Sequence, residues 1–160
     1  MEEQPTQDMI DKWHRWFGVQ SSNGAWDLTT RPQRTPADDQ EMLNLAYTSA
    51  YHWSKIGKPI NIARGDITLA HVHSLLGHGD LALGYARRAL EFFENNECED
   101  WDLAFAHMEM ALAAVVLGDA DLHAQHYTTA GTLGETIQDE EDRQVFLGEY
   151  ARIPSHVLLD

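Results

Sequence analysis

Two similar stretches, 41 residues apart, decide the fold: Leu76-Gly77-His78-Gly79-Asp80-Leu81 and Leu117-Gly118-Asp119-Ala120-Asp121-Leu122. A leucine followed by glycine is typical of a helix end, and the aspartate that follows can cap the next helix. The same offset aligns Ala70 with Ala111, which are small residues of the kind found where two helices cross. The pattern therefore predicts a repeated hairpin of two antiparallel helices.

Helix-start and helix-stop residues divide the rest of the chain into about seven helices. Thr35-Pro36-Ala37-Asp38 combines an N-cap, a proline at the first helical position and a capping-box acid. Gly57 ends that helix and Pro59 begins the next. No window shows the alternation of a strand. The sequence predicts an all-α single domain over 1–160, with an N-terminal helix at 6–17, a long loop at 18–35, antiparallel helical hairpins over 36–137 and a C-terminal helix at 139–152.

The segment 18–35 breaks this pattern, because it is rich in Gly, Ser, Asn, Thr and Pro. A connection of that length is uncommon in a compact domain and is often either functional or mobile. Trp26 and Leu28 within it would be costly to expose together. We therefore favour a loop that packs on the helices as a plug, with a ligand lid as the alternative.

The composition indicates a folded, acidic protein. Of the 160 residues 43% are hydrophobic, which excludes disorder for most of the chain. Lys and Arg number 11 against 26 Asp and Glu, for a net charge of −15, and residues 97–160 hold 14 of the acids. This charge argues against nucleic acid and anionic membranes as partners. It could steer a basic protein partner, although solvated helix faces explain it more simply.

The cysteine count and the hydropathy of the chain indicate the cellular compartment in which we expect the protein. A lone Cys98 excludes an internal disulfide framework and fits a reducing environment. The start at Met1 lacks a basic region followed by an apolar stretch, and no apolar run is long enough to cross a bilayer. We expect a soluble, cytoplasmic protein.

The hairpin pattern resembles the tetratricopeptide family. A leucine, a small residue and a later Leu-Gly turn recur in the first helix of each copy, and spaced alanines recur in the second. In the first copy these are Leu69-Ala70, Leu76-Gly77, Ala82, Ala86 and Ala89, and in the second Met110-Ala111, Leu117-Gly118, Tyr127 and Ala130. The resemblance covers 66–133 and, more weakly, 8–56. The family's Trp position is held by Asp66 and His107, so the chain would be a divergent relative.

The resemblance implies a short superhelix whose first helices line a concave, protein-binding groove. Its inward positions correspond to Arg64, Ile67, His71, Phe105, Met108 and Leu112. Grooves of this family commonly hold acidic peptide ends with basic residues, and here only Arg64 would serve. An apolar stripe at helical spacing is more often core than binding surface. The loop at Trp26, the N-terminal helix or a second copy could cover it, and a homodimer does so economically.

The nine histidines raise the question of a metal-binding site, because His and carboxylate side chains are common metal ligands. His123 and His126 share a helix face near Asp119, but His107 is about 6 Å out of level with them in the hairpin. Dispersed, hydrogen-bonded histidines are the favoured interpretation, and we assign no metal ligand and no cofactor. Charging of the histidines between about pH 7 and 5 could also make an assembly pH-responsive.

The residues therefore favour a helical-repeat interaction module that binds a protein partner or itself, as a homodimer, and has no catalytic activity. Neither a phosphate-binding loop nor a nucleophile elbow is present. The carboxylates around Cys98 should raise the pKa of its thiol and make it a poor nucleophile. The alternative is a helical-bundle enzyme or sensor with a metal site at His107, His123, His126 and Asp119.

Overall fold

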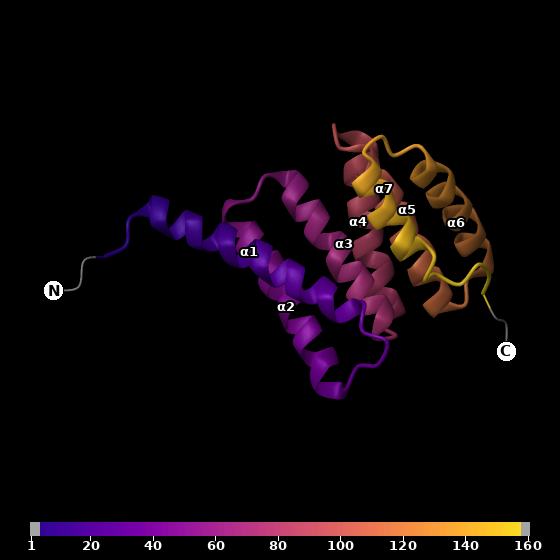
Figure 1. Ribbon diagram of the computed structural model, residues 1–160, viewed down its shortest axis with the longest axis horizontal. Helices are drawn as coiled ribbons and strands as arrows, with labels where there is room; N and C mark the ends of the chain where they lie inside the picture. The colour runs from indigo at the N-terminus through magenta and orange to yellow at the C-terminus, as the bar shows by residue number, and fades with distance from the viewer. Residues whose placement is uncertain (1–3, 158–160) are drawn as a thin grey trace.

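The computed structural model describes residues 4–157, and within them the chain is all-α, as predicted (Figure 1). The first and last three residues of the predicted domain lie outside this range. No strand occurs in the described part, which contains seven helices. They are α1 (Gln7–Thr29), α2 (Pro36–Ile56), α3 (Pro59–Leu75), α4 (Gly79–Asn95), α5 (Asp100–Leu117), α6 (Ala120–Glu135) and α7 (Glu140–Tyr150).

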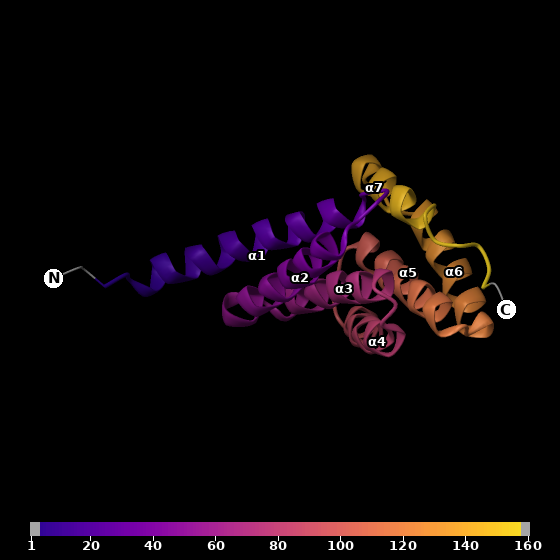
Figure 2. The same cartoon turned by 90° about the horizontal axis from the view of Figure 1, so that it is seen from below.

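The helices form a stack in which each helix contacts the next one in the chain. The odd-numbered helices also contact one another in series, α1 with α3, α3 with α5, and α5 with α7. Figure 2 shows α7 crossing back over α5 and approaching the C-terminal end of α1. The odd-numbered helices thus enclose a common space on one side of the stack. None of the helices within residues 4–157 is both long and apolar enough to cross a membrane.

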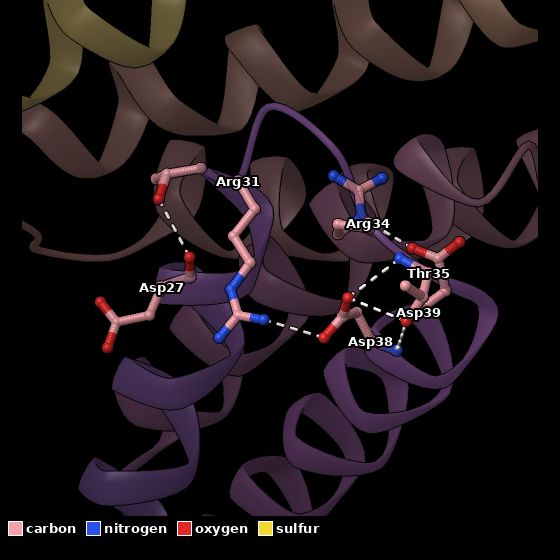
Figure 3. A network of polar contacts seen from close by, with 7 residues as sticks. Asp27, Arg31, Arg34, Thr35, Asp38 and Asp39 are labelled. Carbon is pink, nitrogen blue, oxygen red and sulfur yellow. Dashed lines mark hydrogen bonds and ion pairs between the residues drawn. The ribbon is translucent and has the colours of Figure 1, made fainter.

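The predicted turns are confirmed in their backbone geometry. Gly77 and Gly118 have φ angles of 76° and 71°, the left-handed region that favours glycine. At the start of α2, the Thr35 side chain accepts a hydrogen bond from the Asp38 N–H, and the Asp38 carboxylate accepts one from the Thr35 N–H (Figure 3). The Thr35 N–H and the Thr35 hydroxyl both donate to the Asp38 carboxylate, and these two bonds lower the pKa of Asp38. Arg31 and Arg34 add ion pairs to Asp38 and Asp39.

The prediction of a loop over 18–35 is wrong for most of that segment. The N-terminal helix continues past residue 17 to Thr29, and only a short connection precedes α2. Gly18 is buried against α2, where an added Cβ would lie 3.0 Å from the Trp53 ring. The Gly18 carbonyl accepts a hydrogen bond from the Ser49 hydroxyl at 2.8 Å. Small residues in this segment therefore permit a close helix crossing, and they do not break the helix.

Candidate functional site

A cavity of about 470 Å³ lies among the odd-numbered helices. We call it the central cavity. Its walls are formed by Trp26 from α1, Arg64 and Ile67 from α3, Trp101 and Phe105 from α5, and Glu149 from α7. Three of the six predicted groove residues, Arg64, Ile67 and Phe105, line it. Its volume lies in the range of about 300–1,000 Å³ that is typical of ligand pockets.

Arg64 is held by an ion pair at one side of the cavity. Its Nε and one terminal nitrogen each lie 2.8 Å from a carboxylate oxygen of Asp102, a bidentate geometry. Asp102 is only 1% exposed and also accepts a hydrogen bond from the Glu99 N–H. The Arg64 guanidinium lies 4.4 Å from the centre of the Trp101 ring. The hydrogen bond to Asp102 raises the pKa of Arg64, so this cation is permanently charged and already neutralised.

Trp26 forms the wall that α1 contributes. Its indole N–H donates to the Thr68 hydroxyl at 3.2 Å, which fixes the plane of the ring. The ring centre lies 4.6 Å from that of His71 and 6.3 Å from that of Phe105. The expectation that Trp26 packs against the helices is therefore met, although it does so from a helix and not from a loop.

His71 lies behind Trp26, outside the cavity lining, in contact with Glu109 of α5. The His71 Nδ1 and the Glu109 Oε1 are hydrogen-bonded at 2.9 Å, and both side chains are buried. Burial would lower the pKa of His71, but attraction and hydrogen bonding by Glu109 outweigh it and raise that pKa. The second carboxylate oxygen, Oε2, has no hydrogen-bond partner among the described residues. This prediction of a groove residue is corrected, because His71 holds α3 to α5 and does not face a ligand.

Met108 and Leu112 belong to the core and not to an open groove. Met108 is fully buried, and both pack in one cluster with Phe146 of α7 and with Ile153, which follows α7. From the sequence, the possible covers for this apolar stripe were the long loop, the N-terminal helix and a second copy. The structure gives α7 as the cover, which leaves only the part of the groove between α1 and α7 open as the cavity.

Besides Asp102, three carboxylates line the cavity, and none of the four was identified from the sequence: Asp27 of α1, and Asp142 and Glu149 of α7. Asp27 and Asp142 are exposed, and Glu149 contacts Arg152 at 3.3 Å. Figure 3 shows that the Asp27 carboxylate points away from Arg31, whose guanidinium pairs with Asp38 instead. No pattern in the sequence identifies these three, since they come together only when α1 continues to Thr29 and α7 folds back.

The histidines occur mostly in pairs between helix segments. The Nδ1 atoms are 2.8 Å apart in the pair His14–His52, 3.0 Å apart in His73–His78 and 2.8 Å apart in His107–His126. His107 thus meets His126 despite the level difference expected from the sequence. Each pair is a hydrogen bond between two imidazoles, of which at least one is neutral.

The other members of the alternative metal site lie apart from this pair. His123 pairs through Nε2 with the Pro154 carbonyl at 2.9 Å, and Asp119 caps α6 by accepting from the Leu122 N–H. In the part of the chain that the structure describes, no three His, Cys, Asp or Glu side chains form a group able to hold a metal ion. The arrangement therefore does not assemble the predicted donor set.

Comparison with known proteins yields no relative. No protein-family model matches the chain, and neither a curated protein nor a solved structure is significantly similar to it.

Proposed function

We propose that the protein is a divergent tetratricopeptide-like interaction module that binds a segment of a protein partner in its central cavity, without catalytic activity. The observation that carries the proposal is the cavity itself, which four helices enclose and which combines aromatic walls with charged groups. Helical stacks of this kind use the inner face of the first helices as their binding surface. A chain with a single cysteine, Cys98, fits a reducing compartment, which supports a cytoplasmic location.

The spacing of the helices supports the family resemblance. α3 begins at Pro59 and α5 at Asp100, and α4 begins at Gly79 and α6 at Ala120, which in both cases is an offset of 41 residues. Side chains of α3 and α5 that contact each other are 38 residues apart in the sequence, three fewer than the repeat offset. Arg64–Asp102 and His71–Glu109 are examples. Successive hairpins are thus displaced by about one helical turn, as stacking into a superhelix requires.

A binding role fits the chemistry of the cavity better than catalysis does. Asp102 is the most buried carboxylate in the lining, and it is saturated by Arg64 and by the Glu99 N–H. A carboxylate held in this way is not available as a general base. The groups that remain free at the cavity are suited to recognising a ligand and not to transforming it.

We also propose self-association through the outer side of α1. Met9, Trp13, Trp16 and Phe17 are 45–57% exposed and follow one another at helical spacing, and we call them the outer stripe. The first turns of α1 extend beyond the other helices (Figures 1 and 2). Exposed aromatic side chains gathered in this way mark an interaction surface, and a second copy brings an identical stripe.

The test of the binding function is to fill the cavity. Ser22 lines it from α1, and a Ser22→Trp substitution would occupy much of its volume without removing a buried apolar side chain. Peptides selected by the wild-type protein from a displayed random library should bind Ser22→Trp at least tenfold more weakly, the scale of losing one well-placed contact. Fluorescence polarisation of the labelled peptides gives the dissociation constants.

Gln125→Trp provides the matched control, because Gln125 is exposed on α6 and does not line the cavity. The selected peptides should bind this variant as they bind the wild type. Equal binding to Ser22→Trp and the wild type, or a selection that enriches no peptide, would contradict the proposed function.

A further inference from the structure

We propose that the central cavity recognises a cationic side chain, arginine or lysine, presented by a basic segment of the partner protein. The inference rests on the proposed binding function and names the chemistry of its ligand. This specificity is opposite to that of tetratricopeptide grooves that bind acidic peptide ends, in which a residue such as Arg64 would bind the peptide carboxylate.

The charges at the cavity favour a cation. Arg64 and Asp102 neutralise each other, since both oxygens of Asp102 are bound by the guanidinium. Asp27, Asp142 and Glu149 remain, and Arg152 partly offsets Glu149 from 3.3 Å away. The unpaired charge around the cavity is therefore negative, and it comes from helices at the two ends of the stack. An incoming anion would meet this field, and among the described residues that line the cavity the cationic side chain is Arg64, which Asp102 already binds.

The walls supply the second element of cation recognition. Trp26, Trp101 and Phe105 present aromatic rings to the cavity. Arg64 lies 4.4 Å from the Trp101 ring centre while a carboxylate binds it edge-on, so the site already holds one guanidinium by a ring and a carboxylate. A cation placed over the Trp26 face could use Asp27 or Glu149 in the same way, with the ring quadrupole attracting its charge. Aromatic walls with a carboxylate rim are a chemistry suited to organic cations.

The size of the cavity and the charge of the chain identify a peptide side chain as the occupant. A volume of about 470 Å³ accommodates one or two side chains and not a whole helix. The net charge of −15 attracts a basic protein over a distance before it docks. A basic segment is drawn by both the field of the whole chain and the local carboxylates.

The experiment compares three labelled peptides of equal length on the full chain: one alternating arginine with leucine, one alternating glutamate with leucine and one alternating glutamine with leucine. Fluorescence polarisation at 50 and 300 mM salt measures each affinity. The arginine peptide should bind most tightly, and more weakly at high salt, because exposed charges are screened within about 10 Å. It should bind the double variant Asp27→Asn/Glu149→Gln roughly fivefold to tenfold more weakly, as expected for two partly exposed charge pairs.

The control double variant Glu41→Gln/Asp121→Asn changes the net charge equally but lies on α2 and α6, away from the cavity. It should keep wild-type affinity for the arginine peptide. Equal losses in both double variants would show nonspecific attraction and overturn the proposal, as would no binding of the arginine peptide. If the glutamate or glutamine peptide binds more tightly, and Ser22→Trp abolishes that binding, the binding function stands and the cationic specificity falls.

Discussion

The apolar surfaces at the two ends of the helical stack differ in how far they are covered. At the C-terminal end, α7 folds back and buries Phe146 against Met108, so that the apolar face of α5 is closed within the chain. At the N-terminal end, Phe17 of the outer stripe stacks on His52 of α2, but Trp13 and Trp16 are 50% and 57% exposed. Repeat stacks need a polar or covered surface at each end to stay soluble. One end is thus covered by the chain itself, and the exposed side chains at the other end are the surface for which we propose association.

The largest effect is expected from opening the closed end. Phe146 is fully buried, and its ring is so near the backbone of Gly134 that a Cβ there would clash with it. Phe146→Ala should lower the free energy of unfolding by about 3–5 kcal/mol, through lost burial and the cavity left behind. Urea denaturation followed by circular dichroism measures this loss. The neighbouring Val145 is 58% exposed, and Val145→Ala should change stability by less than about 0.5 kcal/mol. Similar losses in both variants would refute the covering role of α7.

A smaller, pH-dependent effect should distinguish the histidine pairs at the two ends. Burial lowers the pKa of both His107 and His126 below 6.5, and His107, Glu94 and Arg87 add smaller charge effects at His126. At the other end, burial and, to a smaller extent, His14 lower the pKa of His52. The unfolded chain therefore takes up protons near pH 6.5 before the folded chain does. This contribution to stability is complete above that pH and is lost as the pH falls through the lower folded values.

The histidine pairs should accordingly contribute a fall in the urea midpoint as the pH drops from 7.5 to 5.5. His107→Gln should flatten this fall more than His14→Gln does, because two lowered pKa values belong to the C-terminal pair. His71 acts in the opposite sense, since its raised pKa favours the folded state at low pH, and it is unchanged in both variants. An equal pH dependence in the wild type and His107→Gln would contradict this assignment.

The smallest effect on stability is expected at the open end. Trp13→Ser/Trp16→Ser removes two exposed side chains and should change the free energy of unfolding by less than about 0.5 kcal/mol. The same variant should sediment as a monomer at concentrations where the wild type is a dimer, because the outer stripe is removed. Leu81→Ser on α4, which replaces a side chain that is 51% exposed, should remain a dimer. A wild-type monomer, or a dimer that survives the double substitution, would refute association through α1.

Local backbone chemistry accounts for what the sequence predicted well. The turns at Gly77 and Gly118 require a positive φ, and the start of α2 requires a capping residue at Thr35, so single residues reveal these boundaries. At Gly18 and Ser21, by contrast, the local sequence did not predict the structure. Small polar residues are as typical of a tight helix crossing as of a loop, and only the partner helix, which places Trp53 and Ser49 beside Gly18, decides between them.

The candidate site was predictable only in part, because it depends on how distant helices pack. The register of α3 and α5 brought Arg64, Ile67 and Phe105 to the cavity, as a helical hairpin pattern can indicate. The position of α7 was not contained in that pattern, so neither the helix that covers Met108 nor the carboxylates Asp142 and Glu149 could be predicted. The His107–His126 contact was missed because counting residues from a turn gives backbone levels and not the reach of two imidazole side chains.

The continuity of α1 has a mechanical consequence. Trp16 of the outer stripe and Trp26 of the cavity wall lie on one helix of 23 residues, about 15 Å apart along its axis. A loop between them would absorb a small rotation, whereas an unbroken helix transmits it. A partner that turned α1 about its axis at Trp16 would therefore also turn Trp26 and Asp27 within the cavity. Binding at the two proposed surfaces would then be energetically coupled, with the same factor in both directions.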